Sequence, residues 1–199
     1  QIVEKLNQAG IGLLPDGMHL ERVLPGEEVE VQADGSARII TPIADRVKPP
    51  CRHFKSCGGC AVQHASDDFV ATWKTKIVER AMTARGLPFP FRTLHTSPPQ
   101  SRRRARLSGR RTKKGAMVGF HGKASEVLVD VTDCQLLLPS IRAGFPALEA
   151  LTVIAASRKS EINLTVTDTL GGLDVFVEIE RELTGQLRIE LAGVAEQYN

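Results

Sequence analysis

Four cysteines are the residues of this 199-residue chain with the clearest chemical potential. Cys51, Cys57 and Cys60 form a C-x5-C-x2-C array, and Cys134 follows far downstream. One thiolate for each iron suits a four-iron cubane cluster. Three close cysteines let one loop wrap a corner of such a cluster, and a distant fourth cysteine ties in another segment. The spacing therefore favours a [4Fe–4S] cluster held by all four cysteines.

Two glycines, Gly58 and Gly59, separate Cys57 from Cys60. Glycine adopts backbone angles that other residues avoid, and it lets backbone amides approach a neighbouring atom closely. Hydrogen bonds to the sulfurs are among the features that tune an iron–sulfur cluster. We therefore expect this glycine pair to serve the cluster-binding loop.

Structural zinc is the main alternative. Cys57 and Cys60 form one C-x2-C pair, and His53 or His64 could replace a missing thiolate. Structural zinc sites are usually built from two short pairs, however, and the second pair is absent from this sequence. Four free and inert cysteines are the remaining interpretation.

The segment 101–114 carries six arginines, two lysines and no acidic residue. We expect residues 102–108 to form a strand, so that Arg102, Arg104 and Arg106 share one face. A row of guanidinium groups matches a phosphate backbone, because each group can make two parallel hydrogen bonds. This row predicts nucleic-acid binding without distinguishing RNA from DNA.

More basic side chains are expected at the tip of the hairpin that follows this strand: Arg110, Arg111, Lys113 and Lys114. A solvated charged hairpin without a partner is the alternative, but acidic residues would then normally be interspersed. The sequence contains no G-x-G-x-x-G motif, no P-loop and no other catalytic constellation.

Short strands and frequent turns indicate an α+β fold that is rich in β-structure. Residues 1–45 predict a small unit of barrel type, with a hairpin of 28–31 and 37–40 around Asp34-Gly35. Ser66 is expected to cap a helix that runs to about Arg85, with a packing stripe through Phe69 and Trp73. Further strands are expected near 102–108, 116–121, 161–168 and 173–179, with a helix near 140–155.

The composition excludes several classes of protein. The chain is 42% hydrophobic and 25% charged, with a formal net charge of +3. It has no apolar run near the roughly 20 residues that span a bilayer. Its four cysteines are too few for a secreted disulfide scaffold of this length. We therefore expect a cytoplasmic monomer that does not enter a membrane.

Taken together, these segments resemble the iron–sulfur branch of the bacterial RNA uracil-5-methyltransferases, which act on ribosomal RNA. Four blocks carry the resemblance in the same order: residues 46–64, 102–108, 119–120 and 125–134. In the arginine block, where the family usually has Tyr-Arg-Asn-Arg, Arg102 and Arg104 match, and Ser101 and Arg103 differ. Similarity over 136–180 is looser.

The resemblance implies a TRAM domain, a central cluster-bearing domain and a C-terminal methyltransferase domain of Rossmann type. Residues 1–45 would be a short TRAM-like unit and residues 46–199 the central domain, with the methyltransferase domain absent. The implied cluster ligands are Cys51, Cys57, Cys60 and Cys134. The implied partner is RNA, with ribosomal RNA favoured over transfer RNA.

The family's reaction uses a nucleophilic cysteine and S-adenosylmethionine as the methyl donor. All four cysteines fall at cluster positions, and no loop for S-adenosylmethionine is found, so we expect this chain alone to be inactive. The alternatives are a stand-alone zinc or iron–sulfur module that binds nucleic acid without catalysis, and a redox protein whose cluster carries electrons.

Overall fold

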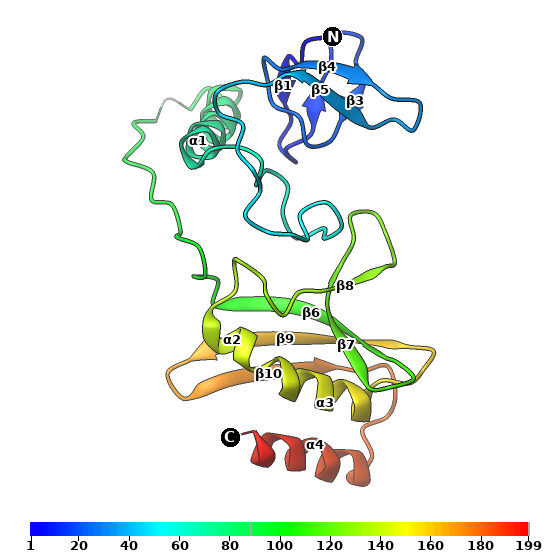
Figure 1. Ribbon diagram of the computed structural model, residues 1–199. Helices are drawn as coiled ribbons and strands as arrows, with labels where there is room; N and C mark the ends of the chain where they lie inside the picture. The colour runs from blue at the N-terminus through cyan, green and yellow to red at the C-terminus, as the bar shows by residue number, and fades with distance from the viewer. Residues whose placement is uncertain (88, 199) are drawn as a thin grey trace. The chain divides into compact units, whose positions relative to one another are not determined.

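The computed structural model describes residues 1–87 and 89–198 as an α+β fold with three sheets (Figure 1). All paired strands are antiparallel, and strands hold slightly more residues than helices. The chain divides into two compact units. The first unit contains Gln1–Phe54 and Cys60–Thr96, and the second contains Lys55–Gly59 and the residues from Ser97 on. The expected α+β class is confirmed.

Short antiparallel strands begin the first unit. They are β1 (Lys5–Leu6), β2 (Gly12–Leu13), β3 (His19–Leu20), β4 (Glu28–Val31) and β5 (Ala37–Thr41). β1, β2 and β3 form one sheet, and β4 pairs with β5 in the hairpin predicted around Asp34-Gly35. Among the described residues these strands form two separate sheets and no closed barrel. Strands of two residues offer too few ladder hydrogen bonds to close one.

Helix α1 (Asp67–Thr83) is the helix predicted from Ser66 onward. The Ser66 hydroxyl accepts a hydrogen bond from the Phe69 amide at 3.2 Å, so the predicted N-cap is confirmed. Phe69 and Trp73 pack against a small core that includes Leu24, which is fully buried. The apolar stripe of α1 therefore serves packing within the first unit.

The first unit contains a buried ion pair. Glu27 has no exposed surface, and Arg46 donates hydrogen bonds to both of its carboxylate oxygens. Glu27 Oε2 also accepts from the Leu24 amide at 2.7 Å, and Arg46 Nη2 donates to the Arg22 carbonyl at 2.8 Å. Because both charged groups have several partners, their hydrogen bonds connect Arg46 to the segment 22–27.

The second unit is built on a five-stranded antiparallel sheet in the order β10-β9-β6-β7-β8. Its strands are β6 (Arg104–Arg111), β7 (Ala116–His121), β8 (Leu128–Asp130), β9 (Glu161–Thr169) and β10 (Gly172–Glu178). The strand predicted at 116–121 is confirmed residue for residue, and those at 161–168 and 173–179 are confirmed to within one residue at each end.

Three helices belong to this unit: α2 (Pro139–Ala143), α3 (Phe145–Ala155) and α4 (Gly185–Gln197). The single helix predicted over 140–155 is wrong, because it breaks at Gly144. Pro146 has no N–H to continue the hydrogen-bond ladder, and its ring crowds the preceding turn. α4 was not predicted, although its N-cap Thr184 accepts a hydrogen bond from the Leu187 amide at 3.2 Å.

The main core of the second unit lies between its sheet and its helices. Leu107 of β6 and Leu164 of β9 are buried there together with Ile141 of α2 and Leu148 of α3. Figure 1 shows α2 and α3 lying across the sheet, with α4 next to α3. Of the helices in residues 1–87 and 89–198, none combines the length and the apolar character that crossing a bilayer requires.

Candidate nucleic-acid interface

Alternation along β6 separates its basic side chains from its apolar ones. Ala105 and Leu107 are 5% and 1% exposed and belong to the core, whereas Arg104 and Arg106 are exposed on the opposite face. Arg102 precedes β6 and is also exposed, and its backbone forms a bridge with Leu137. The sequence pattern therefore placed two of the three expected arginines in one row.

We call the sheet surface that carries these arginines the open face. Strand register places on it, among other residues, Arg104, Arg106, Ser108, Arg110, Met117, His121, Glu161, Asn163, Thr165, Thr167, Asp174, Phe176 and Glu178. The ion pair between Arg106 and Glu178, at 3.2 Å, shows that side chains of β6 and β10 point to the same side.

The hairpin tip is shorter than the sequence suggested. β6 continues to Arg111, which lies opposite Ala116, so Arg110 and Arg111 are strand residues rather than tip residues. Pairing with β7 extends the strand because the turn needs only residues 112–115, closed by a hydrogen bond from the Thr112 amide to the Gly115 carbonyl at 2.9 Å. Lys113 and Lys114 do lie in the turn and are exposed, as expected.

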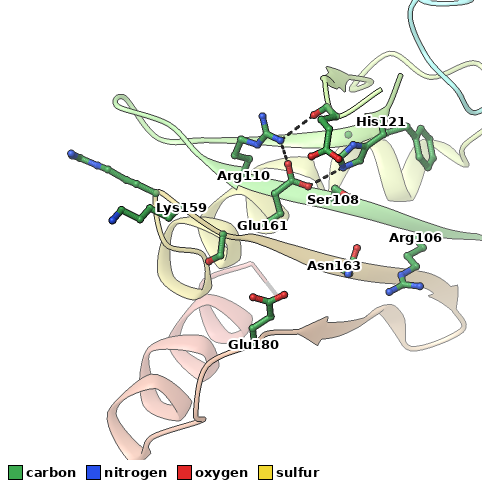
Figure 2. A pocket seen from close by; sticks show the side chains of 13 residues that line it. Arg106, Ser108, Arg110, His121, Lys159, Glu161, Asn163 and Glu180 are labelled. Atoms are coloured by element: carbon green, nitrogen blue, oxygen red, sulfur yellow. Dashed lines mark hydrogen bonds and ion pairs between the residues drawn. The ribbon is translucent and has the colours of Figure 1, made fainter. Parts of the chain in front are cut away.

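A pocket of about 930 Å³ lies over the open face (Figure 2). Four cationic side chains line it: Arg106, Arg110, Arg158 and Lys159. Three acidic side chains also line it: Glu126, Glu161 and Glu180. The pocket is thus cationic on balance, and one of its carboxylates, Glu161, is paired with Arg110, so that an incoming anion would have to displace it.

Glu161 is the centre of the polar network in this pocket. Its carboxylate forms an ion pair with Arg110, and its Oε2 lies 2.8 Å from His121 Nε2 (Figure 2). Arg110 also donates to the Glu126 carbonyl at 3.1 Å. His121 therefore belongs to a network that spans β7, β6 and β9.

Sequence reasoning missed the contribution of β9 and of the loop before it. Glu161 and Asn163 alternate with the buried residues Ile162 and Leu164, so the predicted strand already contained the signal for a polar face. No local pattern pointed to Arg158 and Lys159, because only the approach of β9 to β6 brings this loop beside the arginine row.

Two of the four cysteines lie in the second unit. Cys134 is 7% exposed and belongs to the main core cluster, and Cys57 packs against the same cluster. Cys134 follows a turn in which the Asp130 carboxylate accepts from the Thr132 amide at 3.0 Å. Cys57 and Cys134 therefore lie in the same apolar environment.

The two glycines after Cys57 each donate a hydrogen bond from the backbone amide. Gly58 donates its amide to the His121 carbonyl at 2.9 Å, and a Cβ at this position would lie 2.9 Å from the same oxygen. Gly59 donates its amide to Cys57 Sγ at 3.4 Å. Neither glycine has a positive φ. Close approach accounts for Gly58, whereas a Cβ on Gly59 would lie at ordinary contact distance, 3.4 Å or more from its neighbours.

The other two cysteines, Cys51 and Cys60, lie in the first unit. All four thiols are free of disulfide bonds. The Cys51 amide donates to Gln63 Oε1 at 3.3 Å. Among the residues that the structure describes, no group of three or more His, Cys, Asp or Glu residues is gathered closely enough to hold a metal ion.

The zinc alternative depends on a histidine in place of a cysteine. His64 is 1% exposed, and its Nε2 donates to the Val23 carbonyl at 3.3 Å. Its ring also lies 5.5 Å from that of Phe54, centroid to centroid. These contacts make His64 part of the packing of the first unit.

Comparison with known proteins relates the chain to RNA methyltransferases. An uncharacterized RNA methyltransferase of Brucella suis is 34% identical over 83% of this chain and 41% of its own length. A second, from Agrobacterium fabrum, is 36% identical over 85% of this chain and 43% of its own length. No protein-family model matches the chain.

A relative with a named reaction is the 23S rRNA (uracil(1939)-C(5))-methyltransferase RlmD of Aromatoleum aromaticum. It is 32% identical over 84% of this chain and 43% of its own length. The chain thus spans less than half the length of the relatives it matches. It is homologous to the N-terminal region of RNA methyltransferases that include this rRNA enzyme.

Proposed function

We propose that this chain is the RNA-binding, [4Fe–4S]-carrying portion of an S-adenosylmethionine-dependent RNA uracil-5-methyltransferase that modifies ribosomal RNA. The similarity over more than four fifths of the chain to RNA methyltransferases, one of them a 23S rRNA (uracil(1939)-C(5))-methyltransferase, carries the proposal. In this proposal residues 1–45 are the TRAM-like unit and residues 46–199 the central domain. The methyl donor binds elsewhere in the full-length enzyme.

The arginine row supports the assignment of RNA as the partner. Arg104 and Arg106 are exposed side by side on a rigid strand, which presents their guanidinium groups at a fixed spacing to a phosphate backbone. The remaining proposed contacts are Arg102, Arg110, Arg111, Lys113 and Lys114; of these, Arg111 ends β6 on the face opposite to the row. Most of these side chains are exposed, and Arg110 is half-buried beside Glu161.

Salt-dependent binding to RNA tests this assignment. Replacing Arg104 and Arg106 together by Gln should weaken binding and lower the slope of log K against log salt by about two, since each lost phosphate contact removes about one. Arg38→Gln is the matched control, because Arg38 is an exposed arginine on β5 in the first unit. An unchanged slope in the double variant would remove these two arginines from the interface.

The cysteines fit the proposed cluster in their chemistry. None of the four forms a disulfide bond, and the Gly59 amide donates to the sulfur of Cys57, as amides do around iron–sulfur clusters. The ligands would be Cys51, Cys57, Cys60 and Cys134. When bound, such a cluster would supply four metal–thiolate bonds that order the ligand loops.

Metal analysis separates the cluster from zinc. Anaerobically purified protein should absorb near about 400 nm and hold about four irons and four sulfides per chain. Cys134→Ser should lower the iron content, and His53→Ala should leave it unchanged. Colourless protein with one zinc would instead favour the stand-alone zinc module that binds nucleic acid.

We also propose that the 199 residues are inactive without the rest of the enzyme, because no cysteine is left to act as the nucleophile. The test is incubation with S-adenosylmethionine and uridine-containing RNA. Formation of 5-methyluridine above background would contradict this proposal.

A further inference from the structure

Phe176 is an aromatic side chain exposed on the open face, at the edge of the sheet. It lies on β10, the edge strand of the sheet, and is 60% exposed. Its strand neighbours Val175 and Val177 pack against the core, so strand alternation directs Phe176 to the opposite side. The other aromatic residue of these strands, Phe120, packs against the core instead.

The register of the sheet places Phe176 in line with the arginine row. Phe176 is opposite Thr165 of β9, and Thr165 is opposite Arg106 of β6. In the next row Asn163 stands between Ser108 and Glu178. A flat apolar ring and a guanidinium group thus lie in one row, two strands apart, and an amide lies in the next row.

The polar groups beside this ring are available to a ligand. In residues 1–87 and 89–198 the structure shows no hydrogen bond from the Asn163 amide group or the Ser108 hydroxyl, and none from the Arg104 guanidinium group. An amide can donate and accept hydrogen bonds at the edge of a base. Positive charge from Arg104 and Arg106 complements phosphate, which favours a nucleic-acid occupant over an apolar protein segment.

From this arrangement we propose that the open face binds unpaired RNA nucleotides, with one base stacked on Phe176 and its phosphates near Arg104 and Arg106. The inference rests on the proposed RNA-binding function and adds its substrate class: single-stranded rather than duplex RNA. A base in a duplex is already stacked on its neighbours and hides its faces, whereas an unpaired base can stack on an aromatic side chain.

Binding of single-stranded and duplex RNA tests the inference. With the full 199-residue chain, Phe176→Ala should weaken binding of a short oligouridylate about tenfold, since base stacking on an aromatic residue contributes that much. It should leave binding of a duplex RNA of the same length unchanged. Phe176→Trp should retain both affinities, which separates stacking from a folding defect.

Phe89→Ala is the matched control, because Phe89 is 61% exposed but lies outside the sheet. Cross-linking of 5-bromouridine RNA should label the tryptic peptide that contains Phe176. Equal binding of oligouridylate by Phe176→Ala and the parent chain would overturn the inference, as would an equal loss for both RNAs. If the parent chain binds neither RNA, the proposed RNA-binding function itself fails.

Discussion

Arg46 in the first unit and Arg110 in the second unit both pair with a glutamate, but in different surroundings. The Arg46 side chain is 22% exposed and its partner Glu27 is fully buried. The Arg110 side chain is 43% exposed, and its partner Glu161 is 27% exposed in the wall of a pocket. Both pairs join a guanidinium group to a carboxylate, but water reaches Arg110 and Glu161 more readily than Arg46 and Glu27.

This difference in burial separates a structural ion pair from an exchangeable one. A buried carboxylate that loses its partner stays buried and charged, which is costly, whereas a carboxylate in an open pocket can be solvated. Loss of Arg46 should therefore destabilise the first unit. Arg110 can exchange Glu161 for a phosphate group at a small cost.

The largest expected effect is on the stability of the first unit. Arg46→Met should lower its free energy of unfolding by about 3–5 kcal/mol, because it leaves Glu27 buried without a counter-charge. Urea unfolding monitored by the fluorescence of Trp73, the single tryptophan of the chain, reports on this unit. Arg38→Met, which breaks the exposed pair with Glu30, should change stability by about 0–1 kcal/mol.

In the second unit, close backbone packing takes the place of a buried ion pair. A Cβ on Gly119 would overlap the Val129 carbonyl on β8, so Gly119→Ala should destabilise this unit by about 1–3 kcal/mol. Hydrogen exchange of β7 and β8 amides measures the loss. Gly193→Ala, in α4 with open space around it, should instead stabilise by about 1 kcal/mol.

Burial of His64 near Arg46 and Glu27 also predicts that the stability of the first unit depends on pH. Burial holds the pKa of His64 below its ordinary value of 6.5, opposed by the hydrogen bond to Val23 and assisted by the charge of Arg46. Below pH 6.5 His64 binds a proton in the unfolded chain, whereas in the folded chain it binds that proton only at a lower pH. Stability should therefore fall as the pH falls, with a slope of up to about 1.4 kcal/mol per pH unit.

His64→Gln should flatten this slope, as followed by Trp73 fluorescence between pH 5 and 7, the range in which histidine titrates. His19→Gln is the control, because His19 is exposed on β3. An equal slope in the parent chain and His64→Gln would assign the pH dependence to another group.

The smallest expected effect concerns the pair in the pocket. Glu161→Gln should change stability by less than about 1 kcal/mol and raise RNA affinity up to about fivefold, because it releases Arg110 and removes a charge that repels phosphate. Glu30→Gln makes the same change of charge in the first unit and should leave affinity unchanged. Tighter RNA binding by both variants would indicate a general effect of net charge.

Features that depend on neighbouring residues were predictable from the sequence. Ser66 caps α1, Asp34-Gly35 turns the β4–β5 hairpin, and Arg104 alternates with the buried Ala105, all as local patterns indicated. Helix α4 was missed because only Leu187 and Val194 are buried along it, which leaves a weak apolar pattern.

The sequence by itself determined the local elements, the arginine row and the cysteine spacing, because caps, turns and alternation act over a few residues. Only the tertiary structure decided which partners the charges find. Glu27 contacts Arg46 through the folding of a loop, and Glu161 contacts Arg110, 51 positions earlier in the chain, because β9 pairs with β6. Such pairings depend on the register of distant strands and on burial, and neither can be predicted from residues that are close in sequence.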